Sequence, residues 1–69
     1  MLTLLRTENG YAGETNRIDV SVIYFAQGDW RGFARSAGGL MTFHYGTTAQ
    51  ECVDNMRDSC GRMELQSGV

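Results

Sequence analysis

The chain has 69 residues, a formal net charge of −2 and six basic residues, all of them Arg. This size allows one small domain with a thin core, and no apolar run approaches the roughly 20 residues that a membrane-spanning helix needs. The slightly acidic balance disfavours a general affinity for nucleic-acid phosphates. The first residues also lack the basic region and apolar run of a secretory signal, so we expect a cytoplasmic protein.

The cysteine and histidine content argues against both a disulfide and a metal site. Cys52 and Cys60 lie in one segment with helical periodicity, where a rise of about 1.5 Å per residue separates their Cα atoms by about 12 Å. A disulfide requires Cα atoms within roughly 7 Å. One His and no Cys-x-x-Cys motif leave a structural zinc site without ligands. We therefore expect free thiols, no metal and no cofactor.

The N-terminal segment divides into a short strand and a polar stretch. Leu2 and Leu4 alternate with Thr3, which is typical of a strand. Residues 7–17 are rich in turn-forming residues and contain Asn9-Gly10, a frequent hairpin turn. The polar stretch is longer than a tight hairpin, so we expect a strand followed by a long loop.

Three further strands are predicted. Residues 18–25 show the clearest alternation and are rich in β-branched side chains. A tight turn at residues 26–29 leads to a returning strand at residues 30–36, and the break at residues 37–39 precedes a strand at residues 40–46. Strands joined by such short turns are expected to pair antiparallel.

A helix is predicted to begin at Thr48 and to end at Gly61. Thr48-Ala49-Gln50-Glu51 fits a capping box, in which the Thr48 hydroxyl accepts from the Glu51 N–H and the Glu51 carboxylate accepts from the Thr48 N–H. Gly61 suits the left-handed residue that ends a helix. Apolar residues recur at helical spacing and form one stripe: Cys52, Val53, Met56 and Cys60.

These elements predict an α+β domain, a small antiparallel sheet of three to four strands with one C-terminal helix packed on one face. Residues 1–17 form the N-terminal strand and loop, residues 18–61 the core, and residues 62–69 a tail without a clear pattern. One helix can cover only one face of the sheet. The other face is covered either by residues 1–17, including Tyr11, or by a partner or second copy of the chain.

If the other face is an interface, large apolar side chains from the predicted strands would form it. The candidates for a partner or dimer interface are Ile23, Phe25, Trp30 and Leu40. We expect a homodimer, held by these side chains or by strand pairing along an open edge, because association adds buried surface to a domain with a thin core.

Residues 18–60 are predicted to form a strand, a turn, two further strands and a helix. Five features mark this order: the turn Gln27-Gly28-Asp29, Trp30 at the start of the returning strand, Gly46 before the helix, the helix opening Thr48-Ala49-Gln50-Glu51-Cys52, and Asn55-Met56. In this order and in these features residues 18–60 resemble the HicB-like antitoxin domain. The resemblance implies a module that engages and blocks a partner protein, commonly an RNA-cleaving toxin.

The sequence offers no candidate catalytic residues. His44 lies in a predicted strand without the orienting carboxylate and nucleophile that a general base needs. The chain has no Lys for a Walker phosphate loop. We therefore expect no enzyme but a small interaction protein that inhibits or masks a partner macromolecule. The partner would be a toxin, a nuclease or, for a phage-encoded inhibitor, a host defence complex.

A small RNA- or DNA-binding module is the alternative. Arg31, Phe33 and Arg35 alternate on one strand and share a face, and Trp30 is adjacent. Basic and aromatic residues together are typical of nucleic-acid sites. Arg on an edge strand also discourages aggregation between sheets, and this explanation agrees better with the acidic remainder of the chain.

Overall fold

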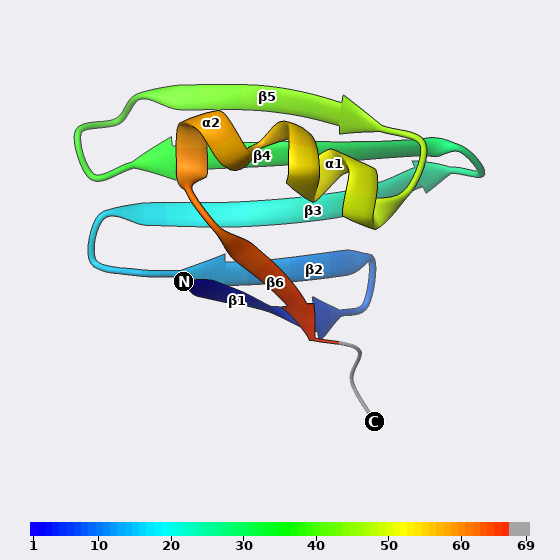
Figure 1. Cartoon of the computed structure of the whole chain (residues 1–69), viewed down its shortest axis with the longest axis horizontal. Helices are drawn as coiled ribbons and strands as arrows, with labels where there is room; N and C mark the ends of the chain where they lie inside the picture. Colours follow the sequence, from blue (N-terminus) through cyan, green and yellow to red (C-terminus); the bar gives the residue numbers. More distant parts are fainter. Residues whose placement is uncertain (67–69) are drawn as a thin grey trace.

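A computed structural model describes residues 1–66 of the chain, which form a single sheet with two short helices on one side (Figure 1). The elements follow in the order β1 (Leu2–Thr7), β2 (Gly10–Glu14), β3 (Ile18–Ala26), β4 (Asp29–Ser36), β5 (Met41–Gly46), α1 (Ala49–Asn55), α2 (Arg57–Cys60) and β6 (Met63–Gln66). The described strands lie side by side in the order β5-β4-β3-β2-β1-β6. Neighbours pair antiparallel except β1 and β6, which are parallel.

The predicted sheet of three to four antiparallel strands with one helix is wrong. Within residues 1–66 the sheet has six strands and is mixed, and the helical part is short. The first error is the expected long loop, which is instead a hairpin whose strands β1 and β2 are joined across the Thr7 and Gly10 pair. Gly13 hides this strand in the sequence, yet it is needed there: a Cβ at position 13 would lie 2.7 Å from the Thr3 carbonyl oxygen. Glycine in a strand often marks such a close approach.

The second error concerns the C-terminal tail. Residues 63–66 form β6, which pairs in parallel with β1 so that Met63 lies beside Leu2 and Leu65 beside Leu4. This register places the apolar side chains of both strands toward the helices, and Met63 is buried. The remainder of the predicted tail, residues 67–69, lies outside the described residues.

The helix is interrupted at Met56, so that α1 and α2 replace the single predicted helix. The predicted N-cap is confirmed, because the Thr48 hydroxyl accepts a hydrogen bond from the Glu51 N–H at 3.0 Å. The predicted reciprocal bond, from the Thr48 N–H to the Glu51 carboxylate, is wrong. The carboxylate instead accepts from the Thr47 N–H at 3.0 Å and from the Thr47 hydroxyl at 3.2 Å. Gly61 ends α2 with φ +79° and donates its N–H to the Arg57 carbonyl.

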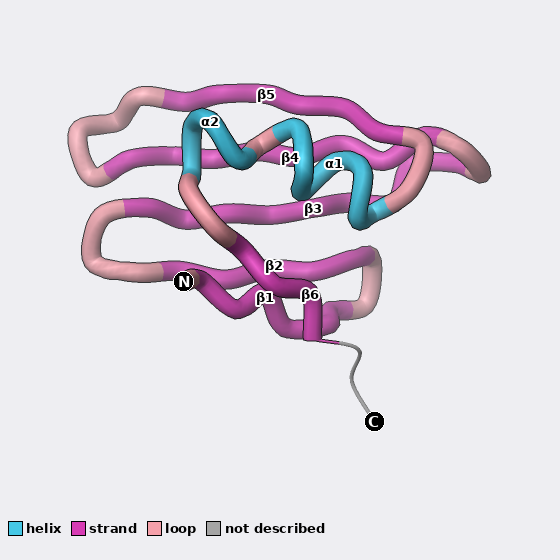
Figure 2. The backbone as a smooth tube through the Cα atoms, in the orientation of Figure 1, coloured by secondary structure: helices cyan, strands magenta, loops and turns pink. Residues whose placement is uncertain are grey.

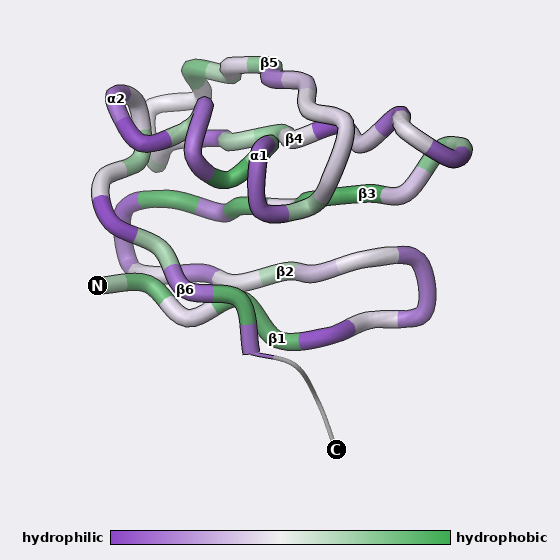
Figure 3. Tube along the Cα trace, turned by 45° about the vertical axis from the view of Figure 1, so that its right-hand side comes forward, coloured by the Kyte–Doolittle hydropathy of each residue, from purple (hydrophilic) through white to green (hydrophobic). Residues whose placement is uncertain are grey.

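The core lies between the sheet and the helices, which lie over β3, β4 and β5 (Figure 2). β1, β3 and α1 each contribute two buried apolar side chains, and apolar stretches of these elements stand out in Figure 3. Within residues 1–66 the buried apolar residues are Leu2, Leu4, Val20, Val22, Ala34, Cys52, Val53, Met56 and Met63. Three of them come from the predicted helical stripe, whose fourth member, Cys60, is half-buried.

Among the described residues, neither helix has the length and apolar character needed to cross a bilayer.

Candidate interaction face

The side of the sheet opposite the helices is uncovered within residues 1–66, and we call it the open face. Strand register determines which residues belong to it, because alternate side chains point to opposite sides of a sheet. Its large side chains are Leu5, Ile23, Phe25, Arg31, Phe33, Arg35, Met41, Phe43 and Tyr45. Several large apolar members are about half exposed or more, including Phe43 at 55% and Tyr45 at 61%. Such a contiguous apolar surface is the usual mark of an interaction site.

The N-terminal segment does not cover the open face, so the first of the two predicted alternatives is wrong. β1 and β2 extend the same sheet beside β3 and do not cross it. Leu2 and Leu4 are buried on the helix side, and Tyr11 packs against that same core. The segment therefore widens the open face, to which it adds the exposed side chain of Leu5.

The half of the open face over β4 and β5 carries an apolar ridge made of Phe33, Met41, Phe43 and Tyr45. Phe33 and Phe43 are direct cross-strand neighbours, and their rings meet edge to face with centroids 5.4 Å apart. The Ser36 N–H donates to the Leu40 carbonyl at 2.8 Å, so Phe33 and Phe43 form a pair without mutual backbone hydrogen bonds. Side chains of such pairs approach most closely, which holds the two rings together.

Both arginines of this half are paired with carboxylates. Arg31 donates to Asp29 through Nε at 3.3 Å and Nη2 at 3.2 Å, and this hydrogen bonding raises the pKa of the guanidinium. Arg35 donates to Asp19 at 3.4 Å. The Arg31 guanidinium also lies 4.2 Å from the centre of the Phe25 ring, a cation–π distance. The open face is therefore apolar and charge-balanced, with no excess of positive charge in this half.

The other half of the open face, over β1, β2 and β3, is hollow. A groove of about 480 Å³ lies there, with more apolar than polar lining. Ala12 and Ser21 are small neighbours in register on its floor, and Leu5 stands beside Ala12. Two carboxylates, those of Glu14 and Asp19, also line this groove. One face of the sheet thus carries a ridge and a groove side by side.

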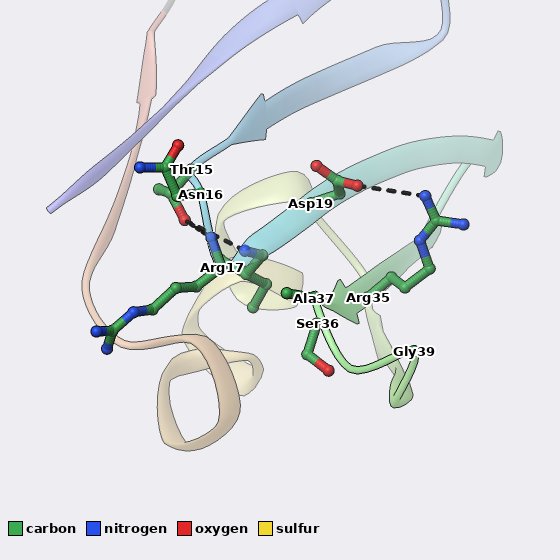
Figure 4. Close-up of a pocket in the computed structure, with 9 residues that line it drawn as sticks. Thr15, Asn16, Arg17, Asp19, Arg35, Ser36, Ala37 and Gly39 are labelled. Atoms are coloured by element: carbon green, nitrogen blue, oxygen red, sulfur yellow. Dashed lines mark hydrogen bonds and ion pairs between the residues drawn. The ribbon is translucent and has the colours of Figure 1, made fainter.

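A second pocket lies where the turn after β2 meets the turn after β4 (Figure 4). The Thr15 hydroxyl accepts hydrogen bonds from the N–H groups of Arg17 at 3.1 Å and Ile18 at 3.2 Å, which stabilises the turn. Figure 4 shows the Arg17 side chain pointing away from the other lining residues, while Asp19 is engaged by Arg35. The polar groups named here are thus engaged in contacts within the chain, and we interpret the pocket as a junction between two turns.

The structure places the four predicted interface residues in different surroundings. Ile23 and Phe25 lie on the open face. Trp30 lies on the helix side, where it packs against the core and meets Tyr24 edge to face at 5.3 Å. Leu40 is 71% exposed in the turn before β5, where its N–H donates to the Ser36 hydroxyl.

The predicted nucleic-acid residues are divided in the same way. Arg31, Phe33 and Arg35 share the open face, whereas Trp30 points to the opposite side. The ridge residues Met41, Phe43 and Tyr45 belong neither to the predicted interface residues nor to the predicted nucleic-acid-binding residues. Their alternation is visible in the sequence, but only the register with β4 shows that they continue the surface begun by Phe33.

The structure gives no arrangement that suggests catalysis among the described residues. His44 lies on the helix side and shares a hydrogen bond of 3.1 Å with the Thr42 hydroxyl. Within residues 1–66 no three His, Cys, Asp or Glu side chains form a group that could hold a metal ion. Comparison with known proteins found no matching family model, no matching curated protein and no matching solved structure.

Proposed function

We propose that this chain is a small non-catalytic interaction protein that binds another macromolecule through the open face. The observation that carries the proposal is the gathering of Phe33, Phe43 and Tyr45 with other large apolar side chains on an uncovered sheet face. Exposing so much contiguous apolar surface is unfavourable in water. Contact with a partner would remove this surface from water, which supplies the driving force for binding.

A protein partner agrees best with the charge of the face. Arg31 and Arg35 are each engaged by a carboxylate, so binding to phosphates would compete with existing ion pairs. The chain as a whole is also acidic. The HicB-like resemblance of residues 18–60 supports an inhibitory or masking role in the cytoplasm, with a toxin, a nuclease or a host defence complex as the partner.

Single-stranded nucleic acid is the second candidate, favoured by one specific observation. The Arg31 guanidinium lies between two aromatic rings, 4.2 Å from the Phe25 centroid and 5.8 Å from the Tyr45 centroid. Aromatic rings and guanidinium groups on an open sheet are the usual stacking platform for unpaired bases. Salt dependence distinguishes the two candidates. Affinity for a nucleic acid is expected to fall steeply as the salt concentration rises, because binding neutralises phosphates.

The test compares Phe43→Glu, on the ridge, with Gln50→Glu, on the exposed surface of α1. Both substitutions add one negative charge, but only the first lies on the open face. Tagged wild-type chain is used to isolate a partner from the native host, and the identified partner is then titrated with each purified variant. Phe43→Glu is expected to weaken binding by about tenfold or more, as for an aromatic residue that carries much of the binding energy of an interface.

The same variants are titrated against fluorescent single-stranded RNA and DNA at several salt concentrations. Salt-dependent binding that Phe43→Glu abolishes would select the nucleic-acid candidate. Equal partner affinity for wild type, Phe43→Glu and Gln50→Glu would overturn the proposal that the open face is the binding surface.

A further inference from the structure

The ridge and the groove of the open face are complementary to each other. The ridge rises over β4 and β5 from bulky side chains, and the groove sinks over β1, β2 and β3, where Ala12 and Ser21 leave space. In the strand order β5-β4-β3-β2-β1-β6 these two features occupy opposite halves of one sheet. A ridge and a groove on opposite halves of one surface allow the surface to fit a copy of itself.

We infer that the open face binds a second copy of this chain, with the ridge of each copy seated in the groove of the other. The inference rests on the proposed role of the open face as an interaction surface, and a different macromolecule that binds this face would replace the second copy. A twofold axis that runs along the strand direction between two facing sheets exchanges their left and right halves. It therefore brings each ridge over the partner's groove in two identical contacts, as a closed dimer requires. The result is a sandwich of two sheets.

The two halves also carry charges that can face each other. Arg35 lies beside the ridge on β4, and Glu14 lines the groove. A twofold axis along the strands keeps each residue at its own level along them, and Arg35 shares its level with Asp19 and Glu14. Arg35 of one copy therefore approaches Glu14 of the other, while Asp19 keeps its ion pair with Arg35 of its own copy. Charge complementarity of this kind fixes the orientation of two partners more than it adds affinity.

The size of the face matches what a stable dimer needs. Figure 1 looks down the shortest axis and shows the sheet broadside, and the two longer dimensions of the molecule are 32 and 24 Å. A standard specific interface buries about 800 Å² on each partner. The broad side of this small chain has dimensions of that order, whereas its edges are narrower because the third dimension is 18 Å.

The outer edge of β5 is a poorer place for a second copy. The Ser36 and Leu40 backbone bond sets the pairing so that the Tyr45 carbonyl points away from β4. The Asn55 side-chain amide donates to that carbonyl at 2.7 Å. This bond occupies an acceptor that an incoming strand would need. Face-to-face packing therefore agrees better with the structure than pairing along this edge.

The experiment uses one ridge variant, Phe43→Glu, and one groove variant, Ala12→Arg, with Gln50→Glu as the control away from the face. Sedimentation equilibrium measures the dimer dissociation constant of each full-length chain, and circular dichroism checks that each is folded. Wild type and Gln50→Glu are expected to form dimers with the same constant. Each face variant is expected to weaken the dimer at least tenfold.

An equimolar mixture of the two face variants gives the sharper result. In the mixed dimer one ridge–groove contact is intact, and the other places the new carboxylate opposite the new guanidinium. The mixture is therefore expected to associate more tightly than either variant alone. If Phe43→Glu does not fold, Phe43→Ser replaces it, and the intact contact alone is then expected to restore association in the mixture.

Three outcomes would overturn the inference: a wild-type monomer at high micromolar concentration, dimers unaffected by both face variants, or a mixture no tighter than its components. A wild-type monomer whose partner binding is still lost in Phe43→Glu would leave the proposed function intact. A dimer broken by Phe43→Glu, together with partner binding that is unchanged in that variant, would support the second copy and contradict the proposed function.

Discussion

Gly32 lies directly beneath Met56, and the two positions together hold α1 against the sheet. A Cβ at position 32 would lie 2.5 Å from the Met56 sulfur and 2.9 Å from the Cys52 sulfur, which is closer than real contacts allow. At Gly32, β4 therefore presents backbone without a side chain to the approaching helix. The helix buries Cys52 and Met56 there because Gly32 has no side chain to compete for the space.

Gly32→Ala is therefore expected to destabilise the protein by about 1–3 kcal/mol, the usual effect of overfilling a packed core. Gly38→Ala serves as the control, because its Cβ would meet only the Ser36 hydroxyl oxygen at 3.8 Å. Urea unfolding followed by circular dichroism measures both free energies. Equal midpoints for the two variants would show that the helix does not rest on β4 as described.

The N-cap gives a second prediction. Thr48→Ala removes the acceptor of the Glu51 N–H and is expected to cost about 1 kcal/mol of unfolding free energy. Thr47→Ala removes only an exposed hydroxyl that donates to the Glu51 carboxylate, so its effect should stay within about 0.5 kcal/mol. The same urea measurement compares the two. A larger loss of unfolding free energy for Thr47→Ala than for Thr48→Ala would show that Thr47, not Thr48, caps the helix.

The strand β6 gives a third prediction. Met63 is buried against the core beside Leu2, whereas its neighbour Glu64 points to the other side of the strand and is exposed. Met63→Ala is expected to destabilise by about 2 kcal/mol, as for a shortened core side chain. Glu64→Ala is expected to change stability by less than about 0.5 kcal/mol. Similar small effects for both would mean that β6 is not part of the core.

The sequence predicts the middle of the fold better than its ends. Period-two alternation identifies β3 and β4, and the capping signal at Thr48 identifies the start of α1, because both patterns are local. The first hairpin has no clear sequence signal, because Gly10 and Gly13 weaken the strand pattern of β2. The strand character of β6 depends on pairing with β1, at the other end of the chain, and such distant pairing leaves no local pattern.

The open face could be predicted only in part. Counting faces shows that one helix leaves one side of the sheet uncovered, and alternation places Arg31 and Phe33 together. Which side each residue occupies depends on the helix position, and alternation alone does not show that Trp30 packs against the core. The groove was not predictable, because it arises from the register that brings Ala12 beside Ser21.

The buried thiol of Cys52 gives a final prediction, on the pH dependence of stability. Burial raises the pKa of this thiol to about 11, whereas a thiol in the unfolded chain has a pKa of about 8.5. Between these values the unfolded chain releases a proton that the folded chain retains. The stability contributed by the neutral thiol is therefore fully present below about pH 8.5 and is lost as the pH rises toward about 11.

Unfolding free energies of wild type and Cys52→Ala are measured in urea from pH 7 to pH 10.5. Cys52→Ala is expected to be less stable at pH 7, because it shortens a core side chain. Above about pH 8.5 the wild type is expected to lose stability more steeply, so the difference between the two chains narrows as the pH rises. Cys60 is half-buried, and burial also raises the pKa of its thiol, so Cys60→Ala serves as the comparison for a thiol at the margin of the core. Parallel pH curves for wild type and Cys52→Ala would contradict the burial of the Cys52 thiol beneath α1.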